Sequence, residues 1–290
     1  MSSPSSSTAS RPPPNPSGTH NPAEADFLPT RDEMERAMSI EIVDQDNEKL
    51  TLGELSKGSR KKRVVLIFIR HFWCTNCQVY THQLGLSIPP RNLPEGTEVA
   101  FIGCGSSAPI KTYTAFTSSP YPVYSCPSLE LHKIFKFVRT LQTADTAPKP
   151  SPSSSKTSDN KSESDNSNTK ASQGNAMGAD TSSTCGAGHG GSCSTTNETT
   201  IGYLDGVGSE TKRIWLSIKN GPFKNFGHYS TSVRGPNDQN GGEMIIEADG
   251  SCSFLHRMQN TADHISIEEL ARAIGAEYVP LSEAERKWPG

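Results

Sequence analysis

Apolar residues in the first half of the chain form short runs whose spacing predicts strands and helices. The run Val64–Ile69 is continuously apolar and largely β-branched, which is typical of a central strand buried on both faces. Helical spacing follows from Thr75 to about Leu86, and Val99–Ile102, stopped by Gly103, predicts a second buried strand. The pattern therefore indicates a strand–helix–strand unit.

Weaker patterns flank this unit. Ile40–Val43 and Leu50–Leu52 are predicted as short strands, and the second leads into a brief helix through Leu55. Pro109 suits the start of another helix, and Tyr121–Tyr124 predicts a third strand after it. These elements extend the predicted sheet and its helical cover.

The clearest helical spacing of this half follows Ser128. Apolar residues recur there at i, i+3, i+4 and i+7, namely Leu131, Ile134, Phe135 and Val138. We therefore expect a helix that reaches Val138. Further along, Thr211–Lys219 is predicted as a helix, and residues 222–242 are polar and Gly-rich, as in a long loop.

The last predicted elements of the chain are a hairpin and a capped helix. Met244–Ile246 and Cys252–Leu255 flank Asp249-Gly250, which predicts a hairpin. Ser266 and Glu269 form a capping box that opens a helix with an apolar face. The order of elements predicts an α/β fold with a central mixed β-sheet flanked by helices.

Composition divides the 290 residues into folding and non-folding parts. Residues 143–200 contain no Val, Ile, Leu, Phe, Trp or Tyr, and 23 of these 58 positions are Ser or Thr. Residues 1–25 lack the same six types, so we expect a disordered tail and a long disordered Ser/Thr-rich insertion. The remaining blocks, 26–142 and 201–290, suit a single domain.

Charge and hydropathy exclude several classes of function. The net charge of −3 and the pI near 6.3 give no electrostatic basis for binding nucleic acid or an anionic membrane. The basic run Arg60–Arg63 precedes a strand and is interpreted as a solvent-exposed segment that leads into it. No apolar run is long enough to span a membrane or to act as a secretory signal, so we expect a cytoplasmic protein.

Two of the seven cysteines carry the candidate chemistry. Cys74 and Cys77 form a CxxC pair where the strand Val64–Ile69 gives way to a helix. The partial positive charge of a helix N-terminus stabilises a thiolate, and a sulfur three residues further on lies close enough to attack a mixed disulfide. We therefore expect Cys74 to be the catalytic nucleophile and Cys77 the resolving thiol. Arg70 and His71 either add positive potential or are exposed loop residues.

Other roles for the cysteines stay open. A CxxC pair can also be half of a zinc site, and Cys185, His189 and Cys193 offer further ligands, although within the expected disordered segment. Neither a metal nor another cofactor is predicted. Three further cysteines are expected to fill the core, namely Cys104, Cys126 and Cys252. His256 and His264 are assigned structural or surface roles in preference to catalysis.

The pieces HFWCTNC, VAFIGCG, SPYPVYSCP, QNGGEMIIEADG and TADH resemble AhpC/TSA-type peroxiredoxin-like proteins of the thioredoxin-fold superfamily, in particular the branch that carries CxxC. The resemblance covers roughly 38–142 and 201–278. It implies a thioredoxin-like fold with the CxxC at the first central strand-to-helix turn. It also implies antioxidant thiol chemistry on a peroxide or disulfide substrate, with electrons from a thioredoxin- or glutathione-like dithiol donor.

The chain departs from two patterns of these relatives. Typical peroxiredoxins carry Pro-x-x-x-Thr/Ser-x-x-Cys, but Ile67 and His71 stand in those places relative to Cys74. Thioredoxins place a cis-proline before the strand that faces the CxxC, where this chain has Asn240-Gly241-Gly242 before Glu243. The alternative function is therefore a non-enzymatic redox sensor or interaction scaffold, with an insertion tuned by phosphorylation.

Overall fold

The computed structural model describes residues 27–57, 63–142, 202–219 and 230–288. The strands are β1 (Glu41–Val43), β2 (Lys49–Thr51), β3 (Arg63–Phe68), β4 (Thr97–Cys104), β5 (Val123–Cys126), β6 (Gly242–Ile246) and β7 (Cys252–Arg257). The helices are α1 (Arg31–Met38), α2 (Leu52–Lys57), α3 (Thr75–Ser87), α4 (Ile110–Thr117), α5 (Glu130–Ile134), α6 (Glu210–Ile218), α7 (Thr231–Arg234), α8 (Ile267–Ile274) and α9 (Glu283–Arg286).

The strands form one mixed sheet of seven in the order β2-β1-β5-β4-β3-β6-β7. β3 is central and pairs in parallel with β4 and antiparallel with β6. The β6–β7 hairpin turns at Asp249-Gly250, as predicted. This arrangement confirms the thioredoxin-like α/β fold and places the end of β3, where the CxxC follows, in the interior of the sheet.

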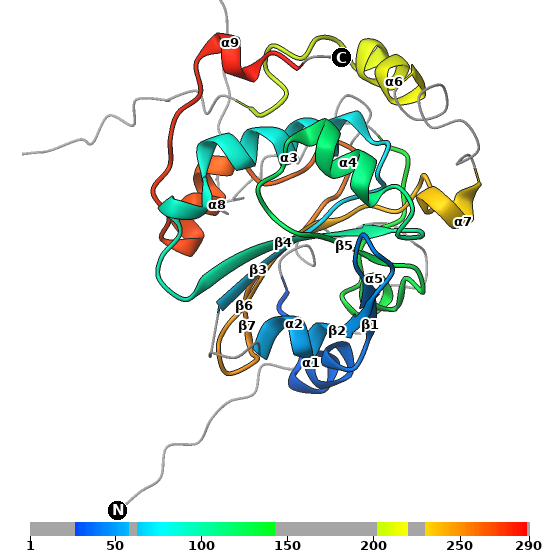
Figure 1. The fold of residues 1–290 in the computed structure, drawn as a ribbon, viewed down its shortest axis with the longest axis vertical. Coiled ribbons are helices and arrows are strands. Elements are labelled where there is room, and N and C mark those ends of the chain that lie inside the picture. The colour runs from blue at the N-terminus through cyan, green and yellow to red at the C-terminus, as the bar shows by residue number, and fades with distance from the viewer. Residues whose placement is uncertain (1–26, 58–62, 143–201, 220–229, 289–290) are drawn as a thin grey trace, which may run out of the picture. The chain divides into compact units, whose positions relative to one another are not determined.

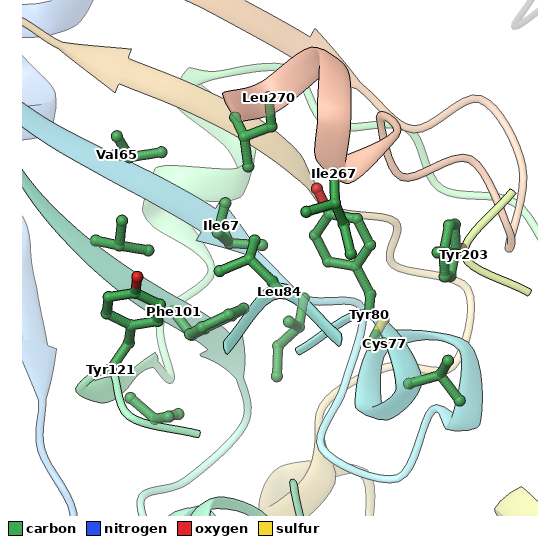
Figure 2. Packing of buried hydrophobic residues seen from close by; sticks show 14 of the residues in the cluster. Val65, Ile67, Cys77, Tyr80, Leu84, Phe101, Tyr121, Tyr203, Ile267 and Leu270 are labelled. Carbon is green, nitrogen blue, oxygen red and sulfur yellow. The ribbon is translucent and has the colours of Figure 1, made fainter. Parts of the chain in front are cut away.

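Alternate residues of the central strands enter two separate cores. Val65, Ile67 and Ile69 pack with residues of α3, α4 and α8 on one face of the sheet, whereas Val64, Leu66 and Phe68 pack with residues of α1, α2 and α5 on the other. Figure 1 shows these helices above and below the strands. Figure 2 shows the first core, with Ile67 near Leu84 and with Ile267 and Leu270 of α8 above them. Burial on both faces explains the continuous apolar run of β3.

The helix after Ser128 is shorter than predicted. It ends at Ile134, and Lys136 then takes a left-handed φ of 57°. The chain continues in extended form, with the O atom of Val138 accepting a hydrogen bond from the N atom of Asn240 at 2.9 Å. Phe137, rather than Val138, is buried and packs against Phe68, so ring packing ends the helix early.

Several further boundaries differ from the predictions. Strand β4 continues through Gly103, which was predicted to stop it. The Phe72 ring packs directly against this glycine, and a Cβ there would overlap the ring. β5 is shifted two residues past the predicted Tyr121–Tyr124. Helix α1 was not predicted, although Thr30 and Glu33 form a capping box that marks its start.

The expected tail 1–25 and insertion 143–200 lie outside the described residues, and the domain boundaries stay a prediction. Within the described segments, no helix is long and apolar enough to cross a bilayer.

Candidate functional site

The two cysteines lie at the start of α3, immediately after the loop that leaves β3. Cys74 occupies the N-cap position with extended backbone and makes no side-chain cap hydrogen bond, so its sulfur is available for other contacts. Cys77 lies in the first turn of the helix. Both are buried, with 3% and 0% of their surface exposed. Figure 2 shows Cys77 beside Tyr80 in the core.

Arg70 supplies a positive charge to the Cys74 sulfur. Its Nη1 atom lies 3.4 Å from Sγ of Cys74. The hydrogen bond from the Cys77 thiol, aided by the charge of Arg70, holds the pKa of Cys74 well below its ordinary value and outweighs the opposing effect of burial. Cys74 is therefore the more acidic thiol of the pair.

Contacts with the residues before β6 hold Arg70 in place. Its Nε atom donates to Oδ1 of Asn240 at 3.0 Å, and Nη2 donates to the O atom of Asn237 at 2.7 Å. Asn240 stands in the segment where thioredoxins carry a cis-proline, so in this chain the segment anchors a guanidinium. Arg70 and His71 are buried, which excludes their interpretation as exposed loop residues. Burial lowers the pKa of His71 to about 4, so Arg70 provides the charge near neutral pH.

Cys77 has the opposite character. Burial, together with the neighbouring Cys74, raises its pKa well above the ordinary value. Its Sγ accepts a hydrogen bond from the backbone N atom of Arg70 at 3.4 Å and lies 3.3 Å from Nε2 of His264. The two thiols therefore differ in acidity in the sense that a nucleophile and a resolving thiol require.

The contact between His264 and Cys77 was not predicted from the sequence. Nδ1 of His264 lies 2.5 Å from Oε1 of Glu243, and both side chains are fully buried. The sequence did contain one signal: Glu243 is an acid directly before the apolar run Met244–Ile246 of a predicted strand, and a carboxylate that is buried there requires a partner.

A cavity of about 500 Å³ opens beside Cys74. Its wall is largely apolar and includes Trp73 of the CxxC loop and Ile214 and Ile218 of α6. The guanidinium of Arg234 also lines it and lies over the Trp73 ring, with 5.8 Å between Cζ and the ring centroid. The site is thus large enough for an organic substrate that carries both apolar and anionic groups.

Helix α6 closes one side of this cavity by docking onto the start of α3. Oγ of Ser217 accepts a hydrogen bond from the N atom of Thr75 at 3.0 Å and donates to Oγ1 of Thr75 at 2.9 Å. One of the unpaired N–H groups at the N-terminus of α3 is thereby occupied by the helix that follows residues 143–200.

Of the other described cysteines, Cys104 lies next to the site, since its Sγ donates a hydrogen bond to the O atom of Arg70 at 2.7 Å. Cys104 and Cys126 are buried, and burial raises the pKa of Cys104 to about 12. Cys252 is partly exposed, so it fills the core less completely than predicted. The candidate ligands Cys185, His189 and Cys193 lie outside the described residues. Among the residues that are described, no group of three or more His, Cys, Asp or Glu side chains is placed to hold a metal ion.

Comparison with known proteins gives one family match and several distant relatives. The model of the AhpC/TSA antioxidant enzyme family matches residues 90–260, a segment that begins after both cysteines of the pair and ends before His264. The chain is 21% identical over 242 residues to Peroxiredoxin-like 2C of Homo sapiens, covering 83% of this chain and 79% of that protein. The Mus musculus protein of the same name is 22% identical over 241 residues, with 83% and 79% covered.

The solved structures that the chain matches are more distant. A structure of Xanthomonas campestris Peroxiredoxin Q has a TM-score of 0.32 and 13% identity, covering 39% of this chain and 65% of that one. A secreted Mycobacterium tuberculosis disulfide oxidoreductase homologous to E. coli DsbE has a TM-score of 0.29 and 10% identity, with 37% and 71% covered.

Proposed function

Because the chain belongs to the AhpC/TSA antioxidant enzyme family, we propose that it is a thiol oxidoreductase in which Cys74 attacks a peroxide or a disulfide and Cys77 resolves the intermediate. The observation that carries this proposal is the difference between the two thiols. Cys74 has a lowered pKa and lines the cavity, whereas Cys77 has a raised pKa and is not among the residues that line it.

The reaction has three balanced steps. With a peroxide, the Cys74 thiolate takes one oxygen and becomes a sulfenic acid, and the other oxygen leaves as water or an alcohol. With a disulfide, Cys74 forms a mixed disulfide and releases one thiol. Cys77 then attacks the Cys74 sulfur, releases water or the second thiol, and closes a disulfide. We propose that a thioredoxin- or glutathione-like dithiol donor returns both cysteines to thiols.

Departures from the peroxiredoxin motif bear on the substrate. The position three residues before Cys74 is held by His71, which is buried and has a lowered pKa, rather than by a hydroxyl that shapes a peroxide pocket. A panel of hydrogen peroxide, cumene hydroperoxide and hydroxyethyl disulfide, with dithiothreitol as the donor, therefore decides which oxidant the cavity accepts.

Two serine variants test the cysteine roles. Cys74→Ser should abolish oxidation of the dithiol, and Cys77→Ser should stop after one turnover with a sulfenic acid or mixed disulfide visible in the intact mass. Cys252→Ser is the matched control and should retain activity, because this thiol lies on β7, outside the residues that line the cavity. Turnover unchanged in both CxxC variants would overturn the proposal and favour the non-enzymatic scaffold.

A further inference from the structure

We propose that His264, oriented by Glu243, is the base that removes the proton from Cys77 when this thiol attacks the oxidised Cys74. The inference rests on the proposed function, in which Cys77 resolves the intermediate. The proton acceptor proposed for Cys77 lies 187 positions after this cysteine in the sequence.

The two ring nitrogens of His264 face different partners. Nδ1 lies 2.5 Å from Oε1 of Glu243, and Nε2 lies 3.3 Å from Sγ of Cys77. A neutral imidazole has one N–H donor and one acceptor nitrogen. A carboxylate accepts hydrogen bonds, so Nδ1 carries the hydrogen and Nε2 presents its lone pair to the sulfur. The geometry is that of a base with its orienting acid.

Cys77 needs such a base. Only a thiolate attacks a sulfur efficiently, and burial keeps Cys77 protonated near neutral pH. In the reduced protein, the Cys74 thiolate, whose pKa is lowered by the neighbouring Cys77 thiol, is an acceptor for the Cys77 proton. That acceptor disappears when Cys74 becomes a sulfenic acid or a mixed disulfide. The Cys77 proton then has Nε2 of His264 within reach, at the moment when resolution requires its removal.

Packing holds the imidazole in this orientation. The Tyr80 ring stacks on it, with 4.3 Å between the ring centroids and an angle of 11° between the planes. The Tyr203 ring and the His264 ring pack in a T-shaped arrangement, with 5.8 Å between their centroids. The second oxygen of Glu243 accepts a hydrogen bond from the N atom of Ile265 at 3.4 Å. A buried, hydrogen-bonded carboxylate beside the ring stabilises the imidazolium that forms.

The proton balance closes within the site. His264 takes the Cys77 proton as the Cys77 sulfur bonds to the Cys74 sulfur. The leaving group is hydroxide from the sulfenic acid or the thiolate of the substrate, and the imidazolium returns the proton to it as water or a thiol. His264 is therefore a catalytic residue, and Glu243 is a positioning residue.

The reagent 5,5′-dithiobis(2-nitrobenzoate) separates the two steps in one experiment. Attack by Cys74 releases a first coloured thiolate, and attack by Cys77 releases a second. The full chain is used with Cys185, Cys193 and Cys252 replaced by serine, so that the signal reports on Cys74 and Cys77. His264→Gln should leave the first release within about twofold and slow the second by about 100-fold or more, as loss of a general base does.

Three further variants make the result specific. Glu243→Gln keeps the shape of the side chain and should slow only the second release, by about tenfold or more, because it no longer fixes the tautomer. His264→Ala should recover part of the second rate when free imidazole is added. His132→Gln is the matched control: this buried histidine packs against Phe68 in the other core and should leave both rates unchanged.

The outcomes distinguish the two proposals. A second release that is unaffected in both His264→Gln and Glu243→Gln, or equal slowing of both releases, would overturn the role of His264 and leave the proposed function intact. A first release that persists in Cys74→Ser would instead overturn the proposed function. If His264→Gln does not fold, the isosteric Glu243→Gln decides the question alone.

Discussion

Nη1 of Arg70 lies 3.4 Å from Sγ of Cys74, so the loop after β3 brings a buried positive charge to a buried sulfur. The guanidinium cannot move away, because Asn240 and the O atom of Asn237 hold its other nitrogens. The acidity of Cys74 therefore depends on a segment at the entrance to β6 as well as on the N-terminus of α3.

Removing this charge should raise the pKa of Cys74. A cation within hydrogen-bonding distance lowers a thiol pKa by about 1–3 units, so Arg70→Met should slow alkylation by iodoacetamide at pH values below the raised pKa of Cys74. The thiolate is lost as the pH falls through the pKa, so the midpoint of the rate–pH profile should move to higher pH. Arg70→Lys, which keeps the charge, should shift it less. An unchanged midpoint in Arg70→Met would show that the charge does not act on Cys74.

Acid should destabilise the fold through buried histidines. Burial lowers the pKa of His132 to about 3, from 6.5 in the unfolded chain. Between these values the unfolded state binds the extra proton, so stability present above pH 6.5 is lost as the pH falls toward 3. From pH 7 to pH 5 this site alone should cost about 2 kcal/mol.

The variant His132→Leu should lose correspondingly less stability over the same interval, as measured by urea denaturation at both pH values. His71 titrates in the same direction and stays in the variant, so some acid sensitivity should persist. A loss as large as that of the wild type would contradict the assignment to His132.

Close backbone contact should make Gly241 intolerant of any side chain. A Cβ at this position would overlap the O atom of Phe68 at the end of β3. Because a backbone atom cannot yield as a side chain does, Gly241→Ala should cost about 3 kcal/mol or more in the free energy of unfolding. Gly202→Ala is the control, since its Cβ would come no closer than 3.7 Å to Asp205 and should change stability little.

The link between α6 and α3 should limit access to Cys74. Ser217→Ala removes two hydrogen bonds to Thr75, each worth about 1 kcal/mol, so α6 should separate from α3 more often. Cys74 should then react faster with a bulky maleimide, and less so with small iodoacetamide. Thr211→Ala, at the exposed start of α6, is the control. An unchanged ratio of the two rates in Ser217→Ala would show that α6 does not restrict the cavity.

Local patterns were sufficient to predict the scaffold around the thiols. The apolar run of β3, the helical spacing after Thr75 and the turn at Asp249-Gly250 each reflect a period or a turn chemistry that neighbouring residues impose on one another. The cap at Ser266 likewise needs only a hydroxyl at the right distance from its own helix. For the same reason, the CxxC could be placed at a strand-to-helix turn from the sequence alone.

Local patterns were not sufficient where the partner comes from far along the chain. The period after Ser128 favoured a helix through Val138, but pairing with the segment before β6 and packing of Phe137 end it at Ile134. Periodicity counts apolar positions and does not say which partner each one meets, so a distant contact can override it.

The environment of the two thiols likewise depends on contacts between residues that are far apart in the sequence. The sequence by itself determined that Cys74 and Cys77 lie together at the start of a helix. Only the tertiary structure decided that Arg70 turns inward to one sulfur and that His264, held by Glu243, meets the other. The physical reason is that the pairing of β6 with β3 brings the two halves of the chain together, and a buried charge or base acts over a few ångströms of space regardless of its distance in sequence.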